Sequence, residues 1–462
     1  MLVTTRREFI RHASLYSLGF LGLKQLSAVA PSGVNAVGYG PLQPDPHGIF
    51  DLPHGFRYRV IARQGERMAD QLLRPGDPDG MAAFPLDQGK IGLICNHELS
   101  QGETAKGAFG PKNENFPAVI QRQCYDPGRG KGPQLGGTTT IIYDPESEKT
   151  ELQYLSLGGT DRNCAGGPTP WNSWITCEET NLRADAQVAK DHGYNFEVPL
   201  STQVGLTRPI PLKAMGRFRH EAVAIDPQTG IVYQTEDMSD GLIYRFIPEV
   251  SGQLSKGGRL QALAIVDQPS FDTRNWPEQT SPKMQTNRAL PVHWIDIEDV
   301  ESPDDSLRFQ GFEKGAARFA RGEGMWAGNG EFFFACTNGG ALQQGQIFRY
   351  IPSPKEGEPG ERSAPGRLAL FIESTSPDLL SNCDNLTVAP NGHLFVCEDS
   401  DTRCRLVGVD PAGRLYTIGA NDYTDSELAG ACFSPDGKIL FLNIQKNGMT
   451  LAITGPWDRV KA

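Results

Sequence analysis

The sequence predicts an all-β fold, and three features of its 462 residues support that prediction. It contains 52 glycines and 34 prolines, the residue types that end strands and form turns. Long stretches with the period of an amphipathic helix are scarce. In addition, several segments repeat one pattern, in which two short apolar strands are separated by a Gly-, Asp- or Pro-rich turn.

The repeated segments begin with a polar or acidic residue in most cases and end in acidic or amide residues. The distance between these ends is similar, with 14 residues from Cys164 to Glu178 and 13 from Asn385 to Glu398. The turn sequences DPQTG, APNG and SPDG place Pro and Gly where tight turns require them. In chain order, the segments are 79–98, 163–179, 220–237, 322–340, 384–400 and 429–445.

Six such hairpins predict a six-bladed β-propeller with long inter-blade insertions, for example 238–321. The first strand of each segment would line the central channel, so that both ends of the hairpin lie near one mouth of that channel. A β-sandwich with similar turn spacing is the alternative. We expect residues 31–462 to form a single β-propeller catalytic domain.

The first 30 residues predict a twin-arginine signal peptide. Thr5-Arg6-Arg7-Glu8-Phe9-Ile10 contains the arginine pair, and an apolar run from Ala13 to Leu23 follows. This run is too short to cross a bilayer, which takes roughly 20 residues, so no stable membrane span is expected. Two small-residue sites, Ala28-Val29-Ala30 and Val34-Asn35-Ala36, place cleavage between about 28 and 36. An ordinary Sec signal or a short helix is the alternative.

This signal predicts a periplasmic or secreted protein that has the twin-arginine translocase as a partner. The translocase carries folded proteins, and this route suits a protein that acquires a cofactor before export. We expect the exported protein to be a monomer.

Charge and cysteine content limit the possible partners. The formal net charge of −11 argues against nucleic acid, because binding phosphate groups requires clustered Lys and Arg. It would also repel an anionic substrate unless bound cations reverse the local charge. The nine cysteines are an odd number, so at least one is free or bound to metal in an exported protein. Those in the apolar runs GLICN, FFFACTN and LFVCED are expected to be small buried residues.

The predicted hairpins bring many acidic side chains to one mouth of the channel. Such crowding is unfavourable without cations, because like charges force protonation. Carboxylate and amide oxygens suit Ca²⁺, whereas a thiolate requires a softer or transition metal such as iron. The residues gathered there are Glu98, Cys164, Glu178, Glu179, Glu221, Glu236, Asp237, Glu323, Asp384, Asn385, Glu398 and Asp399.

Arg321 is the candidate catalytic residue. It lies two residues before Glu323, and residues two apart on a strand face the same way. Its guanidinium could present a fork of donors to a phosphate group beside the metal site. An ion pair at the surface is the alternative for this side chain.

Five motifs of this chain resemble those of the PhoX-type alkaline phosphatases, over a region from about Gly48 to the C-terminus. The first of them is highly specific to that family. The chain departs from the family at Ala83-Phe84, where Phe-Phe is frequent, and in the lengths of its insertions, which leaves the range of substrates open. The motifs are NCAGGPTPWNSWITCEE, AAFPLDQGKIGLICNHE, RHEAVAIDP, ARGEGMWAG and CDNLTVAPNGHLFVCED.

The resemblance implies a six-bladed propeller that hydrolyses phosphomonoesters and scavenges phosphate. It implies two oxo-bridged Fe³⁺ ions and two or three Ca²⁺ ions as cofactors. Cys164 would bridge the iron ions as a thiolate, and Arg321 would bind the substrate phosphate. The implied metal ligands are Glu98, Glu178 or Glu179, Glu221 and Glu323, with Asp384, Asn385 and Glu398 as further candidates.

Two other function classes fit the same pattern. One is another hydrolase on a calcium propeller, such as a lactonase or a phytase, although calcium alone has little use for the thiolate of Cys164. The other is a propeller that binds a ligand without catalysis, since the fold does not determine function.

Overall fold

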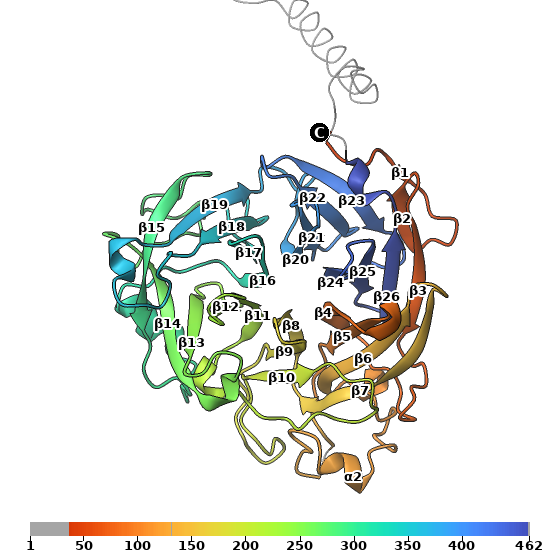
Figure 1. Ribbon diagram of the computed structural model, residues 1–462. Coiled ribbons are helices and arrows are strands. Elements are labelled where there is room, and N and C mark those ends of the chain that lie inside the picture. Colours follow the sequence, from red (N-terminus) through yellow and green to blue (C-terminus); the bar gives the residue numbers. More distant parts are fainter. Residues whose placement is uncertain (1–36, 131, 461–462) are drawn as a thin grey trace, which may run out of the picture. The chain divides into compact units, whose positions relative to one another are not determined.

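Antiparallel strands form nearly all the regular structure in residues 37–130 and 132–460, which the computed structural model describes. The all-β prediction is therefore confirmed, and the strands are arranged like a propeller around a centre (Figure 1). The predicted signal peptide and both of its cleavage sites lie outside the described residues. Gly38–Val460 forms one unit.

The first two sheets follow one another in the chain. The first has the order β4-β5-β6-β7, and the second has the order β8-β9-β10. Their strands are β4 (Pro78–Pro85), β5 (Ile91–His97), β6 (Gly136–Asp144), β7 (Lys149–Thr160), β8 (Asn163–Pro168), β9 (Ser173–Glu178) and β10 (Asn195–Pro199).

The third sheet is the largest, with nine strands in the described chain. In it, β15 pairs with β14 on one side and with β19 on the other, which joins two series of four strands. In order across the sheet, the strands are β11 (His220–Ile225), β12 (Val232–Glu236), β13 (Ile243–Pro248), β14 (Gly258–Ile265), β15 (Ala289–Asp296), β19 (Arg367–Glu373), β18 (Gln346–Ile351), β17 (Phe332–Cys336) and β16 (Gly322–Ala327).

The last two sheets each recruit strands from the N-terminal part of the described chain. β2 pairs with β23, and β3 pairs with β26, so early residues complete sheets begun by late ones. The strands are β20 (Cys383–Val388), β21 (Leu394–Glu398), β22 (Arg405–Val409), β23 (Leu415–Asn421), β2 (Phe50–Pro53) and β1 (Leu42–Gln43), then β24 (Leu428–Phe433), β25 (Ile439–Ile444), β26 (Met449–Thr454) and β3 (Arg57–Arg63).

The innermost strands of these sheets form a closed ring. β4, β8, β11, β16, β20 and β24 each contact the next, and β24 contacts β4 (Figure 1). Neighbouring inner strands approach one another very closely. A Cβ atom on Gly80, for example, would lie only 2.6 Å from the Cα atom of Ala165. A Cβ atom on Gly324 would lie equally close to the Cα atom of Asn385, at 2.6 Å. Glycine is therefore the residue that fits at both contacts.

The hydrophobic core lies between the faces of neighbouring sheets. Leu93 and Ile141 of the first sheet pack in one cluster with Cys432 and Phe441 of the last. In each sheet, the strand next to the innermost one is covered on both faces. Such a strand is therefore buried along its whole length, as β5 is. This burial explains the apolar runs that contain Cys95, Cys336 and Cys397, which are buried as predicted.

Helices contribute little to the described fold. The α-helices are α2 (Ala118–Gln121) and α3 (Leu307–Glu313), and several 3₁₀ turns of three residues connect strands. None of the described helices combines the length and the apolar character required to cross a membrane.

Candidate metal centre

One irregularity recurs in all six inner strand pairs of the described chain. In each pair, the register shifts so that two adjacent residues of the first strand lie opposite one residue of the second, which is a one-residue β-bulge. A bulge re-aims side chains, and here it aims two adjacent residues of each inner strand toward the ring. These pairs are Asp79-Gly80, Cys164-Ala165, Glu221-Ala222, Glu323-Gly324, Asp384-Asn385 and Gly430-Ala431.

A backbone hydrogen bond closes the open end of each hairpin beside the bulge. The residue that follows the second strand donates its N–H to the carbonyl of the residue just before the first strand. Both strand ends are thus fixed without side chains. The bonds are Glu98 to Asp77 (2.9 Å), Glu179 to Arg162 (2.9 Å), Asp237 to Arg219 (3.2 Å), Thr337 to Arg321 (3.0 Å), Asp399 to Asn382 (2.9 Å) and Gln445 to Glu427 (3.4 Å).

These strand ends bring potential metal ligands together in three groups within the described residues. In each group, one ligand atom per residue lies within 4.8 Å of the others. Two of the groups share Glu221, so they are adjacent. The groups are Cys164, Glu179 and Glu221, then Glu221, Glu323 and Asp384, and finally Asp79, Glu98 and Glu427.

The pKa values of these side chains show the electrostatic cost of the arrangement. Burial and the neighbouring carboxylates raise the pKa of Glu98 to about 8 and that of Asp384 to about 7, although arginines act against this rise. The same causes raise the pKa values of Glu221 and Glu323 well above their usual range. Burial raises the pKa of the Cys164 thiol, and Glu221 adds to the rise. A multivalent cation would relieve this repulsion and remove the protons.

Arg162 and Arg321 supply positive charge at the edge of these groups. Arg162 Nη2 lies 2.7 Å from Glu98 Oε1 and also contacts Glu179. Arg321 donates from Nε and Nη2 to the two carboxylate oxygens of Asp237, at 2.8 and 2.7 Å, and from Nη2 to Glu323 at 3.0 Å.

Both arginines have left-handed backbones, with φ of 49° and 54°. This conformation is costly for a residue with a side chain and is frequent at functional sites.

The structure brings most of the predicted site residues to this mouth. Glu98, Cys164, Glu179, Glu221, Glu323 and Asp384 are in the three groups, and Arg321 is beside them. Asn385 lies next to them, where its Nδ2 donates to Asp384 at 3.0 Å and its Oδ1 accepts from the Gly430 N–H at 3.1 Å. It therefore orients Asp384.

The structure does not bring Glu178 and Glu398 to these groups. Glu178 is the last residue of β9 and pairs with Asn163, the first residue of β8, while Glu398 ends β21 and pairs with Cys383 of β20. In this register, both side chains point away from the mouth. Glu178 accepts from His192 Nδ1 at 2.7 Å and from three backbone N–H groups. Glu398 is held by the guanidinium of Arg405. Glu236 occupies the same position in its own pair and accepts from Tyr244.

Asp79 and Glu427 are ligand candidates that the sequence analysis did not select. Asp79 opens the first repeated segment, so its equivalence to Cys164, Glu221 and Glu323 could have identified it. Glu427 precedes the last segment, in which Gly430 occupies the position of the acids, so the repeat gave no comparable signal for it.

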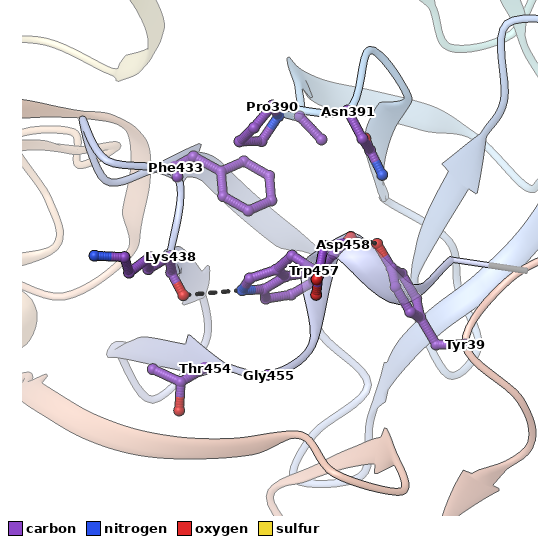
Figure 2. A pocket seen from close by; sticks show the side chains of 11 residues that line it. Tyr39, Pro390, Asn391, Phe433, Lys438, Thr454, Gly455, Trp457 and Asp458 are labelled. Carbon is purple, nitrogen blue, oxygen red and sulfur yellow. Dashed lines mark hydrogen bonds between the residues drawn. The ribbon is translucent and has the colours of Figure 1, made fainter.

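Figure 2 shows a separate cavity of about 580 Å³. It is lined by the aromatic side chains of Tyr39, Phe433 and Trp457, and the Trp457 indole donates to the Lys438 carbonyl at 3.0 Å. Its other walls include the turns of two inner hairpins, at the opposite end from the ligand groups. Within the described chain, this cavity shares no residue with those groups.

Comparisons with known proteins agree with the motifs of the chain. A family model described as "Alkaline phosphatase PhoX" matches residues 37–143 and 140–448. No curated protein matches the sequence. The solved structure of Pseudomonas fluorescens PhoX in complex with vanadate, a transition state analogue, is similar with a TM-score of 0.63 and 17% identity. That match covers 91% of this chain and 98% of the other chain.

A gluconolactonase from Xanthomonas campestris is also similar, at a TM-score of 0.38 and 13% identity. That comparison covers 90% of this chain and 98% of the other.

We predict that Glu178→Gln and Glu179→Gln have different consequences, although the residues are neighbours. Glu179→Gln removes a ligand and should lower the metal content without destabilising the cation-free protein. Glu178→Gln removes a partner of buried His192, so it should cost roughly 3 kcal/mol of stability while the metal content is kept. Elemental analysis and thermal unfolding of both variants measure this difference. Loss of metal in the Glu178 variant alone would contradict the placement of the two side chains.

A second prediction concerns pH. Without cations, the folded chain keeps protons on Glu98 and Asp384 up to pH values of about 8 and 7, whereas their ordinary pKa values are 4.5 and 3.8. Because the folded state binds more protons in this window, the free energy of unfolding falls as pH rises. With excess chelator, the unfolding temperature should be lower at pH 8.5 than at pH 5.5 by about 5 °C or more.

Addition of iron and calcium should abolish this fall, because bound cations displace the protons. Calorimetry at both pH values, with and without chelator, measures the effect. A chelated protein that is equally stable at pH 5.5 and 8.5 would count against the proton uptake of these carboxyls.

Proposed function

The chain belongs to the PhoX alkaline phosphatase family and is a phosphomonoester hydrolase; we propose that it works through cations held by the three ligand groups at the channel mouth. The main support for this proposal is that two of these groups share Glu221 and lie beside the guanidinium of Arg321. A phosphate held there would contact bound cations on one side and a fixed donor on the other.

The residues fit such cations by their chemistry. Asp79 Oδ1 is buried and has no hydrogen-bond partner among the described residues, so an acceptor is left for a cation. Cys164 gives its group a thiol ligand, which suits iron, and we propose two Fe³⁺ ions near Cys164, Glu179 and Glu221. The other two groups offer carboxylate oxygens alone, which suit two or three Ca²⁺ ions.

When bound, such cations supply charge that neutralises the phosphate oxygens and activates the attacking water. Within the chain, Arg321 has the clearest role toward the substrate. Its Nε and Nη2 are held by Asp237 and Glu323, while Nη1 has no partner among the described residues and the side chain is partly exposed. The acids thus fix the guanidinium in one orientation and leave donors for a phosphate oxygen.

We propose that the fold consists of six blades. Support comes from the ring of inner strands and from the two series β11–β14 and β16–β19, which β15 joins into one large sheet. The second sheet has β10 as its outer strand, and an isolated bridge from Phe196 to Pro211 stands where a fourth strand would lie. β3 would complete the sixth blade by pairing with β26.

We further propose export through the twin-arginine translocase to the periplasm or the medium, where the enzyme would scavenge phosphate. The cysteines support this route. All nine are buried, and none of them forms a disulfide in the described structure. Thiols remain reduced when a protein folds in the cytoplasm, whereas a chain that folds after export meets oxidising conditions.

The metal proposal predicts that the protein purified from its export route contains iron and calcium and hydrolyses p-nitrophenyl phosphate. Chelators should abolish this activity. Cys164→Ala should lose iron and at least about 100-fold in kcat while remaining folded, because it removes the ligand that favours iron. Elemental analysis and steady-state kinetics measure both effects. A protein without iron that is also inactive, or a fully active Cys164 variant, would exclude this proposal.

The export proposal predicts that an Arg6→Lys/Arg7→Lys double variant stays in the cytoplasm with an intact signal segment. Cell fractionation and mass measurement of both forms provide the test. Unchanged export of the variant would instead indicate the Sec route.

A further inference from the structure

Three arginines occupy equivalent positions around the mouth. Arg162, Arg219 and Arg321 each precede an inner strand directly, namely β8, β11 and β16. Each carbonyl accepts the N–H of the residue after the second strand, so the three residues hold corresponding places in their hairpins. Arg162 and Arg321 have left-handed backbones there, whereas Arg219 does not. Because β8 contacts β11 and β11 contacts β16, Arg219 lies between the other two along the ring.

Arg219 differs from its two counterparts because its charge has no direct partner. Arg162 and Arg321 each contact two carboxylates. The Arg219 side chain makes no hydrogen bond or ion pair with any described residue, and its Nε is buried without an acceptor. The residue as a whole is nevertheless partly exposed to solvent.

Arg219 nevertheless lies close to the candidate metal centre. Its charge lowers the pKa of Glu179, which burial raises and Arg162 also lowers. The N–H of Asp237 binds the Arg219 carbonyl at 3.2 Å, while the carboxylate of Asp237 holds Arg321. Arg219 and Arg321 therefore flank Asp237, next to the two groups that share Glu221.

A buried donor without a partner is costly, and it points to a ligand that supplies the missing acceptor. The bound cations would engage Glu179, which would leave Arg219 as an unpaired cation at the mouth. The ligand must then be an anion. We propose that Arg219 binds a second non-bridging oxygen of the substrate phosphate and so favours monoesters over diesters. This inference rests on the proposed phosphatase function.

The chemistry of the two substrate classes supports this selectivity. A phosphomonoester carries close to two negative charges at neutral and alkaline pH, because its second pKa is about 6. A diester carries one, and its second ester group occupies the place of an anionic oxygen. An arginine opposite that oxygen is therefore paired in the monoester complex and unpaired in the diester complex.

Arg219→Gln tests the proposal, with Arg219→Lys as the conservative variant and Arg57→Gln on β3 as a matched control. Arg57 lies on an outer strand, is exposed and forms an ion pair with Glu148. For Arg219→Gln, kcat/KM toward p-nitrophenyl phosphate should fall roughly 10- to 100-fold, as expected for loss of a charged hydrogen bond. The value for bis-p-nitrophenyl phosphate should change less than about 3-fold. Lys should restore part of the loss, and metal content should match that of the wild type.

Inorganic phosphate provides a readout that does not depend on turnover. Its dissociation constant for the metal-loaded protein, measured by calorimetry, should rise in Arg219→Gln and stay constant in Arg57→Gln. Equal losses for both esters, an unchanged phosphate affinity or a loss of metal would overturn the role of Arg219. An inactive wild type would refute the proposed function instead, and the phosphate titration would still decide whether Arg219 binds the anion.

Discussion

The chemistry of the channel mouth depends on a one-residue bulge that recurs in each inner strand pair of the described fold. Side chains alternate between the two faces of a strand, so a one-residue difference decides which of two neighbours faces the ring. With the bulge in place, Cys164 and Glu179 face one another across a hairpin, while Glu178 turns to His192. The backbone bond from Glu179 to Arg162 fixes this end of the hairpin, so the ligands sit on a rigid scaffold.

This scaffold brings charges together that repel each other strongly. Two carboxylates at the 4.8 Å limit of a ligand group interact unfavourably by about 3 kcal/mol at an effective dielectric constant of 20. Protonation relieves the repulsion in the cation-free protein, which explains the raised pKa values of Glu98 and Asp384. The buried faces between sheets must stabilise the fold against this repulsion, and cations remove it. Folding, proton binding and metal binding are therefore coupled through the same side chains.

The sequence was sufficient to predict the all-β fold and the gathering of potential metal ligands at the mouth, because turn chemistry and apolar strands recur with a regular spacing. Cys164, Glu221 and Glu323 could be selected since they stand at equivalent positions. Glu178 and Glu398 could not be distinguished from true neighbours of the mouth, because spacing along the chain does not reveal the bulge. Glu427 was missed for a different reason, since the position directly before an inner strand holds an arginine in three other hairpins and so did not indicate a metal ligand.

The sheet boundaries also exceed what the repeat can predict. The link through β15 depends on an insertion whose strand pairs with two others far apart in the sequence, and no repeat encodes that pairing.

Around the ring, the positions directly before the inner strands are occupied by different residue types. Arg162, Arg219 and Arg321 are consecutive, whereas Asn382, Glu427 and Asp77 stand at the equivalent positions elsewhere. An anion is therefore drawn to one side of the mouth, where the groups that share Glu221 lie. In the described structure, the ion pairs of the group Asp79, Glu98 and Glu427 include one arginine contact, from Arg162 to Glu98, so this group is better suited to hold a cation than to bind the substrate.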